Sequence, residues 1–119
     1  MAKLMIAAAH GTDNPTMATL AFIAAKVATD EGHQVTLWLQ NEAVVLAKKG
    51  MVDGVQGVGL KPLKELAAAL ETANVSLWVC QACAVTRQIS PADLVPNAIF
   101  KTMGDYIKGT LESDKNMDF

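Results

Sequence analysis

Short apolar runs alternate along the chain with longer amphipathic segments. The runs at residues 3–9, 34–39 and 75–79 are typical of parallel strands that are buried on both faces. Residues 97–100 and 117–119 are predicted to add a fourth, short strand and a terminal edge strand. Between the runs, apolar positions recur at the spacing of helices. Strands that alternate with helices in this way form right-handed βαβ units and a parallel sheet.

Capping residues and glycines mark where the predicted helices begin and end. Asn14 can cap the first long helix, Pro15 suits its first position, and Gly32 closes it. Asn41 is predicted to cap a second helix that stops at Gly50. After an irregular stretch at 51–60, a third helix is predicted to begin at Pro62, and residues 81–87 are predicted to form a short helix or turn. A capping-box pattern at 90–93 predicts another short helix. The last predicted helix spans 101–112 and directs four side chains inward: Met103, Tyr106, Ile107 and Leu111.

Composition narrows the class of protein. The chain has 119 residues, of which 51% are hydrophobic and 18% charged, which is typical of one ordered domain with a real core. The net charge of −2 favours neither nucleic acid nor an anionic membrane as a partner. So many apolar residues on a small chain predict an oligomer.

No targeting or membrane segment is predicted. The first apolar run is at the low end of the length of a signal-peptide core and meets a polar loop at residues 10–13, so we expect a buried strand and no export. No run approaches the ~20 residues of a membrane span. Two free cysteines without a signal indicate a reducing cytoplasm.

The only two cysteines, Cys80 and Cys83, are spaced C-x-x-C directly after the predicted strand 75–79. This placement favours thiolate chemistry, because a thiolate attacks sulfur electrophiles and a second thiol can resolve or relay the adduct. Cys80 is the predicted nucleophile, since backbone N–H groups and the positive end of a following helix would favour its thiolate. Alternatively, Cys80 is a small buried hydrophobe and Cys83 a core residue.

Two further side chains are predicted to flank Cys80. His10 follows the first strand, and Arg87 ends the 81–87 segment. Ligands bind beyond the carboxyl ends of the strands, so adjacent first and third strands would place both loops around one crevice. His10 would stabilise the thiolate or shuttle a proton, unless it only bonds local backbone, and Arg87 would add positive charge if its turn folds back. No metal site is predicted, because besides the two thiols only His10 is within reach.

Three segments carry a family resemblance that extends over almost the whole chain. Residues 10–15 (HGTDNP), 32–43 (GHQVTLWLQNEA) and 79–87 (VCQACAVTR) resemble the DsrE/DsrF-like sulfur-relay family in order and spacing. The resemblance implies a compact α/β domain that assembles into trimers or hexamers and carries persulfide sulfur on the cysteine at this strand end, here Cys80. Cys83 corresponds to an additional cysteine of only some members. Gln88 departs from the pattern, which has glycine after the arginine.

The fold we expect is a single DsrE/DsrF-like domain over residues 1–119, a three-layer α/β/α arrangement with a mostly parallel sheet of about five strands. The expected function is that of a cytoplasmic sulfur carrier or sulfurtransferase, in which Cys80 accepts sulfane sulfur as a persulfide and delivers it to a partner protein's thiol. His10 and Arg87 would tune the thiolate, and Cys83 would relay or resolve. No cofactor is expected, and the expected partners are sulfur donor and acceptor proteins and copies of the chain in a homotrimer or homohexamer.

Two other functions remain open from the sequence. One is a non-catalytic assembly subunit that binds a small ligand or a protein. The other is a C-x-x-C thiol-disulfide oxidoreductase, which requires a reversible disulfide between Cys80 and Cys83.

Overall fold

A five-stranded parallel sheet forms the centre of the molecule. The computed structural model describes all residues 1–119 and has the strand order β4-β3-β2-β1-β5. The strands are β1 (Lys3–Ala8), β2 (Gln34–Leu39), β3 (Ser76–Cys80), β4 (Ala98–Lys101) and β5 (Lys115–Asp118). Every paired neighbour is parallel, as predicted.

The prediction that the first and third strands are neighbours is wrong. β2 pairs with β1 on one side and with β3 on the other. Each of the first three connections places the new strand beside the one before it, and only the last connection, through α4, crosses the sheet to reach the far side of β1. The loops after β1 and β3 are therefore separated by the loop after β2.

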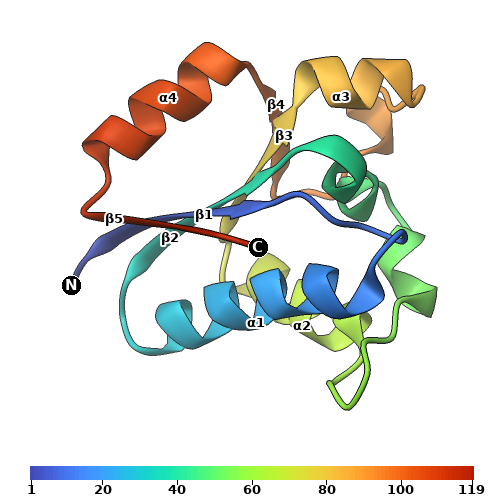
Figure 1. Cartoon of the computed structure of the whole chain (residues 1–119), viewed down its shortest axis with the longest axis horizontal. Coiled ribbons are helices and arrows are strands. Elements are labelled where there is room, and N and C mark those ends of the chain that lie inside the picture. Colours follow the sequence, from blue (N-terminus) through green and yellow to red (C-terminus); the bar gives the residue numbers. More distant parts are fainter.

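Helices cover both faces of the sheet (Figure 1). The helices α1 (Pro15–Asp30) and α2 (Leu63–Thr72) lie on one face and α4 (Met103–Glu112) on the other, while the short α3 (Gln81–Thr86) follows β3 directly. Asn14 caps α1 by accepting a hydrogen bond from the Met17 N–H, and Ser90 begins a capping box with Asp93. These caps confirm the predicted helix starts. None of the helices has the length and apolar character that crossing a membrane requires.

Three short 3-10 helices complete the fold: η1 (Asn41–Ala47), η2 (Met51–Gly54) and η3 (Pro91–Asp93). The second predicted helix is thus a 3-10 helix, and its capping position is Gln40 rather than Asn41. Asn41 has a left-handed backbone with φ of 52°, which frees its side chain and N–H for other partners.

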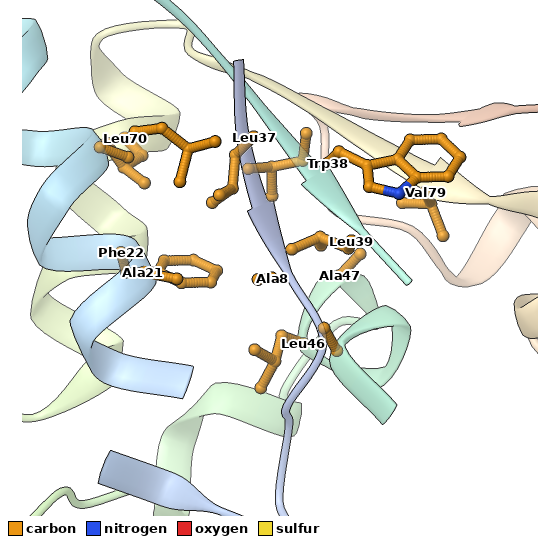
Figure 2. Packing of buried hydrophobic residues seen from close by; sticks show 14 of the residues in the cluster. Ala8, Ala21, Phe22, Leu37, Trp38, Leu39, Leu46, Ala47, Leu70 and Val79 are labelled. Carbon is orange, nitrogen blue, oxygen red and sulfur yellow. The ribbon is translucent and has the colours of Figure 1, made fainter. Parts of the chain in front are cut away.

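The core fills the space between the sheet and its helices. On the α1–α2 side, Phe22 and Leu70 pack toward Leu37 (Figure 2). On the other side, the fully buried Trp38 of β2 stacks on Tyr106 of α4 with ring centroids 4.6 Å apart. The sheet is therefore covered on both faces, as a parallel sheet requires.

The apolar stripe of α4 does not point inward as predicted. Tyr106 and the buried Gly109 are the positions that contact the sheet, and a Cβ on Gly109 would lie 2.8 Å from the Trp78 ring. The side of α4 that carries Met103, Ile107 and Leu111 is turned away from the sheet relative to Tyr106 and Gly109. These three side chains have 52%, 51% and 81% of their surface exposed. Only Tyr106 of the predicted inward residues packs against the core.

Candidate thiol site

The last residue of β3 places Cys80 at the carboxyl edge of the sheet. Cys80 is also the N-cap residue of α3, and only 6% of its surface is exposed. It lines an open pocket of about 470 Å³ together with residues of α3 and the start of α4, namely Gln81, Ala82, Val85, Thr102 and Met103. Cys80 is thus largely covered but lines a pocket that is open to solvent.

Burial raises the pKa of the Cys80 thiol, and the neighbouring Cys83 side chain raises it further. The backbone N–H groups of Cys83 and Ala82 act in the opposite direction, as the sequence predicts, but they do not outweigh the burial. This direction runs against the expectation of a readily formed Cys80 thiolate. At neutral pH, Cys80 is mainly a protonated thiol.

We expect Cys80 to alkylate more slowly at pH 7 than a free cysteine, with a rate that keeps rising above the ordinary thiol midpoint of about pH 8.5. The raised pKa has this sign because a neutral thiol is favoured by burial, so less thiolate is present at any pH. The measurement is the iodoacetamide rate against pH in a Cys83→Ser variant. A midpoint below that of a model thiol would contradict the assignment.

Cys83 has a different environment, although it lies on the same turn of α3. Its sulfur accepts a hydrogen bond from the Asn41 backbone N–H at 3.3 Å, and the Asn41 side-chain amide donates to the Ala9 carbonyl at 3.4 Å. The residue after β2 therefore connects the end of β1 to the second cysteine. Sequence reasoning missed this role because asparagine is also a common helix cap, and Asn41 is predicted at that position. The available signal was that asparagine is among the residues that accept a left-handed backbone.

Arg87 folds back over α3, which is the condition that the sequence analysis set for a role of its charge. Its guanidinium donates to the Cys83 carbonyl at 3.0 Å and to a Glu42 carboxylate oxygen at 2.6 Å. The pairing with Glu42 raises the pKa of Arg87, and the two cysteines act in the same direction, so the guanidinium charge lies near both sulfurs. Glu42, the second residue that sequence reasoning missed, shares that charge.

His10 is not brought into contact with the thiols. Its Nδ1 lies 3.0 Å from an Asp13 carboxylate oxygen, and the other oxygen of Asp13 accepts the Gly11 N–H at 2.7 Å. These bonds lower the pKa of Asp13. Because β2 separates the β1 loop from the β3 loop, His10 bonds within its own loop, to the Asp13 side chain rather than to the local backbone that the sequence left open.

The turn after Arg87 has the shape that a glycine would favour. Gln88 adopts φ of 58°, in the left-handed region, although it has a side chain. That conformation costs a residue with a Cβ roughly 1–2 kcal/mol relative to glycine. The departure from the family pattern at Gln88 therefore leaves the loop shape intact at a local energetic cost.

The side chains around the thiols do not form a metal site. No group of three or more histidine, cysteine, aspartate or glutamate side chains is arranged to hold a metal ion anywhere in the chain. The chemistry available at this edge of the sheet is that of two thiols beside one guanidinium.

Comparisons with known proteins agree with this architecture. The ychN protein from E. coli has a similar structure, with a TM-score of 0.84, 21% sequence identity and coverage of 100% of both chains. MTH1491 from Methanobacterium thermoautotrophicum, described as a protein of unknown function, has a TM-score of 0.69 at 8% identity, and the alignment covers 98% of this chain and 99% of MTH1491. At these identities the two structures show a shared fold. The search of curated proteins gives no match. The family model described as DsrE/DsrF-like matches residues 2–119, so the chain belongs to the DsrE/DsrF-like family.

Proposed function

We propose that this protein is a sulfur carrier that binds sulfane sulfur as a persulfide on Cys80 and passes it to a thiol of a partner protein. Family membership supports a role related to sulfur relay in general. The observation that carries the proposal is the position of Cys80 at the end of β3, where it lines an open pocket three residues before Cys83, whose carbonyl accepts a hydrogen bond from Arg87. Both cysteines are free, which suits a reducing compartment such as the cytoplasm.

The loading step is a thiol exchange that needs no cofactor. The Cys80 thiolate attacks the outer sulfur of a donor persulfide, a new S–S bond forms on Cys80, and the donor leaves as a thiolate. Delivery is the same reaction in reverse, with an acceptor thiolate attacking the outer sulfur and Cys80 leaving. Because the thiolate is the attacking species, the raised pKa of Cys80 predicts that loading becomes faster as pH rises.

We expect the loaded chain to transfer its sulfur to an added thiol. The Cys83→Ser chain, which keeps Cys80 and lacks the second thiol, is incubated with polysulfide, separated from the excess by gel filtration, and mixed with glutathione. Intact mass spectrometry should show one sulfur atom gained on loading and lost on mixing, while glutathione persulfide appears. A chain that gains no sulfur, or that keeps it in the presence of glutathione, would contradict the proposal.

The same proposal includes self-assembly as a homotrimer or homohexamer. Met103, Ile107 and Leu111 form an exposed apolar stripe on α4, and Met103 also lines the Cys80 pocket. Ile99 of β4 is also exposed, with 52% of its surface open to solvent. It is the strand partner of Trp78, whose ring lies next to Gly109 of α4. A second copy seated on α4 would remove this apolar surface from water.

Wild-type protein should therefore sediment above the monomer mass at micromolar concentration. Introducing charge through Ile107→Lys with Leu111→Lys should shift it toward the monomer, because both side chains are exposed within one chain and their loss costs little of the fold. Val58→Lys, at a position that is 86% exposed and far along the chain from α4, is the matched control and should leave the mass unchanged. A wild-type monomer would refute this part of the proposal.

A further inference from the structure

The sulfur of the second cysteine, Cys83, is contacted by Asn41, a residue that is itself fixed by further hydrogen bonds. Asn41 holds a left-handed backbone, which is uncommon for a residue with a side chain, and its N–H then points at the Cys83 sulfur. Its side chain is held at both ends, by the Ala9 carbonyl and by the Arg87 guanidinium at 3.3 Å.

The sulfur of Cys83 has a hydrogen-bond donor of its own. A backbone N–H donor faces that sulfur, and the Arg87 guanidinium is bound to the carbonyl of the same residue. Cys80, by contrast, lies almost covered below the pocket, and Cys83 is half-buried. The two thiols are close in the chain, with Cys80 at the N-cap of α3 and Cys83 in its first turn, three residues on. The structure thus pairs a covered thiol with a more accessible one that has its own hydrogen-bond donor.

We infer that Cys83 attacks the persulfide on Cys80 and releases the terminal sulfur as hydrosulfide, leaving a disulfide between Cys80 and Cys83. This inference rests on the proposed function, because Cys80 must first be loaded. The Cys83 thiolate attacks the inner sulfur of the protonated persulfide, the bond from that sulfur to the terminal sulfur breaks, and HS⁻ leaves with the electron pair. The two cysteines together lose two electrons, and the sulfane sulfur gains them.

The identity of the leaving group decides which sulfur Cys83 attacks. Attack on the outer sulfur would expel the Cys80 thiolate, as delivery to a partner does, and burial raises the pKa of Cys80, which makes it the poorer of the two leaving groups. Attack on the inner sulfur expels hydrosulfide, the anion of a stronger acid than a cysteine thiol. The lower pKa of the leaving group favours this second route. The chain then acts as a persulfide reductase, whose oxidised form must be reset by an external dithiol before it can load again.

The test compares the wild-type chain with Cys83→Ser after brief loading with polysulfide and removal of the excess, without added reductant. The wild-type chain should release hydrosulfide and, after alkylation, have the mass of the unloaded chain less two hydrogens. The Cys83→Ser chain should keep one added sulfur and release no hydrosulfide above the buffer control. A Cys83→Ala variant repeats the comparison without a hydroxyl at this position, and circular dichroism checks that both variants are folded.

Other outcomes separate this inference from the proposed function. A wild-type chain that keeps its sulfur as a stable persulfide overturns the inference and leaves the carrier function intact. Equal hydrosulfide release from wild type and Cys83→Ser also overturns it. The absence of any sulfur adduct on the folded Cys83→Ser and Cys83→Ala chains overturns the carrier function itself. After disulfide formation, treatment with dithiothreitol should restore loading of the wild-type chain.

Discussion

Replacing Cys80 by serine is expected to abolish the loading of sulfur. The hydroxyl of serine matches the thiol in position but does not ionise near neutral pH, so it cannot form the S–S bond that holds the cargo. Cys80 lines the pocket at the end of β3, and no other residue except Cys83 carries a thiol. The measurement is the intact mass after incubation with polysulfide, on a chain shown to be folded by its cooperative unfolding.

The matched control for this experiment is Cys83→Ser, which removes the other thiol on the same turn of α3 and should still load. Because serine at position 80 places a hydroxyl where only 6% of the residue is exposed, we expect a modest loss of stability, about 1–3 kcal/mol if the hydroxyl finds no partner. Sulfur bound stably by Cys80→Ser but not by Cys83→Ser would move the carrier role to Cys83.

Replacing Gly11 by alanine is expected to destabilise the fold and disturb the thiol site at once. A Cβ at Gly11 would lie 2.3 Å from the Glu42 carbonyl oxygen and 3.0 Å from a Val45 methyl carbon. Since the first contact is with backbone, η1 must move to make room. Overpacking of this kind costs typically 1–3 kcal/mol, and here it also displaces the residues that bind Arg87 and the Cys83 sulfur.

Denaturant unfolding of the Gly11→Ala chain measures the first effect. The rate of hydrosulfide release after loading measures the second, and it should fall even under conditions where the variant is fully folded. Gly54→Ala is the matched control, because a Cβ there meets nothing within 4 Å, and it should change the free energy of unfolding by less than about 0.5 kcal/mol. A Gly11→Ala chain as stable as the control would show that η1 does not pack on Gly11 as described.

Local sequence signals predicted most of the fold because they act over a few residues. The apolar run at 34–39 coincides with β2, and Asn14 with Pro15 begins α1 where the sequence places it. The capping box from Ser90 is likewise present. The strand-end position of Cys80 follows from the same kind of pattern, since β3 ends at that residue and α3 begins at the next. Such features depend on side-chain spacing and backbone preference alone.

The parts that could not be predicted depend on contacts between distant residues. Strand order decides that the loop with Asn41 and Glu42, rather than the loop with His10, reaches the thiols. The small residue Gly109 and the ring of Tyr106 decide which side of α4 contacts the sheet, which leaves the stripe from Met103 exposed. The covered position of Cys80 raises its pKa, an effect of burial that no local motif encodes.

A sulfur carrier requires that the Cys80 sulfur can be reached and loaded with sulfane sulfur despite its covered position. The most direct measurement is peptide mapping of the Cys83→Ser chain after a brief pulse of a small persulfide donor at pH 8, followed by alkylation. We predict one added sulfur atom on the peptide that contains Cys80. An unmodified Cys80 in a folded chain, at a donor concentration that charges a free cysteine peptide, would contradict the account.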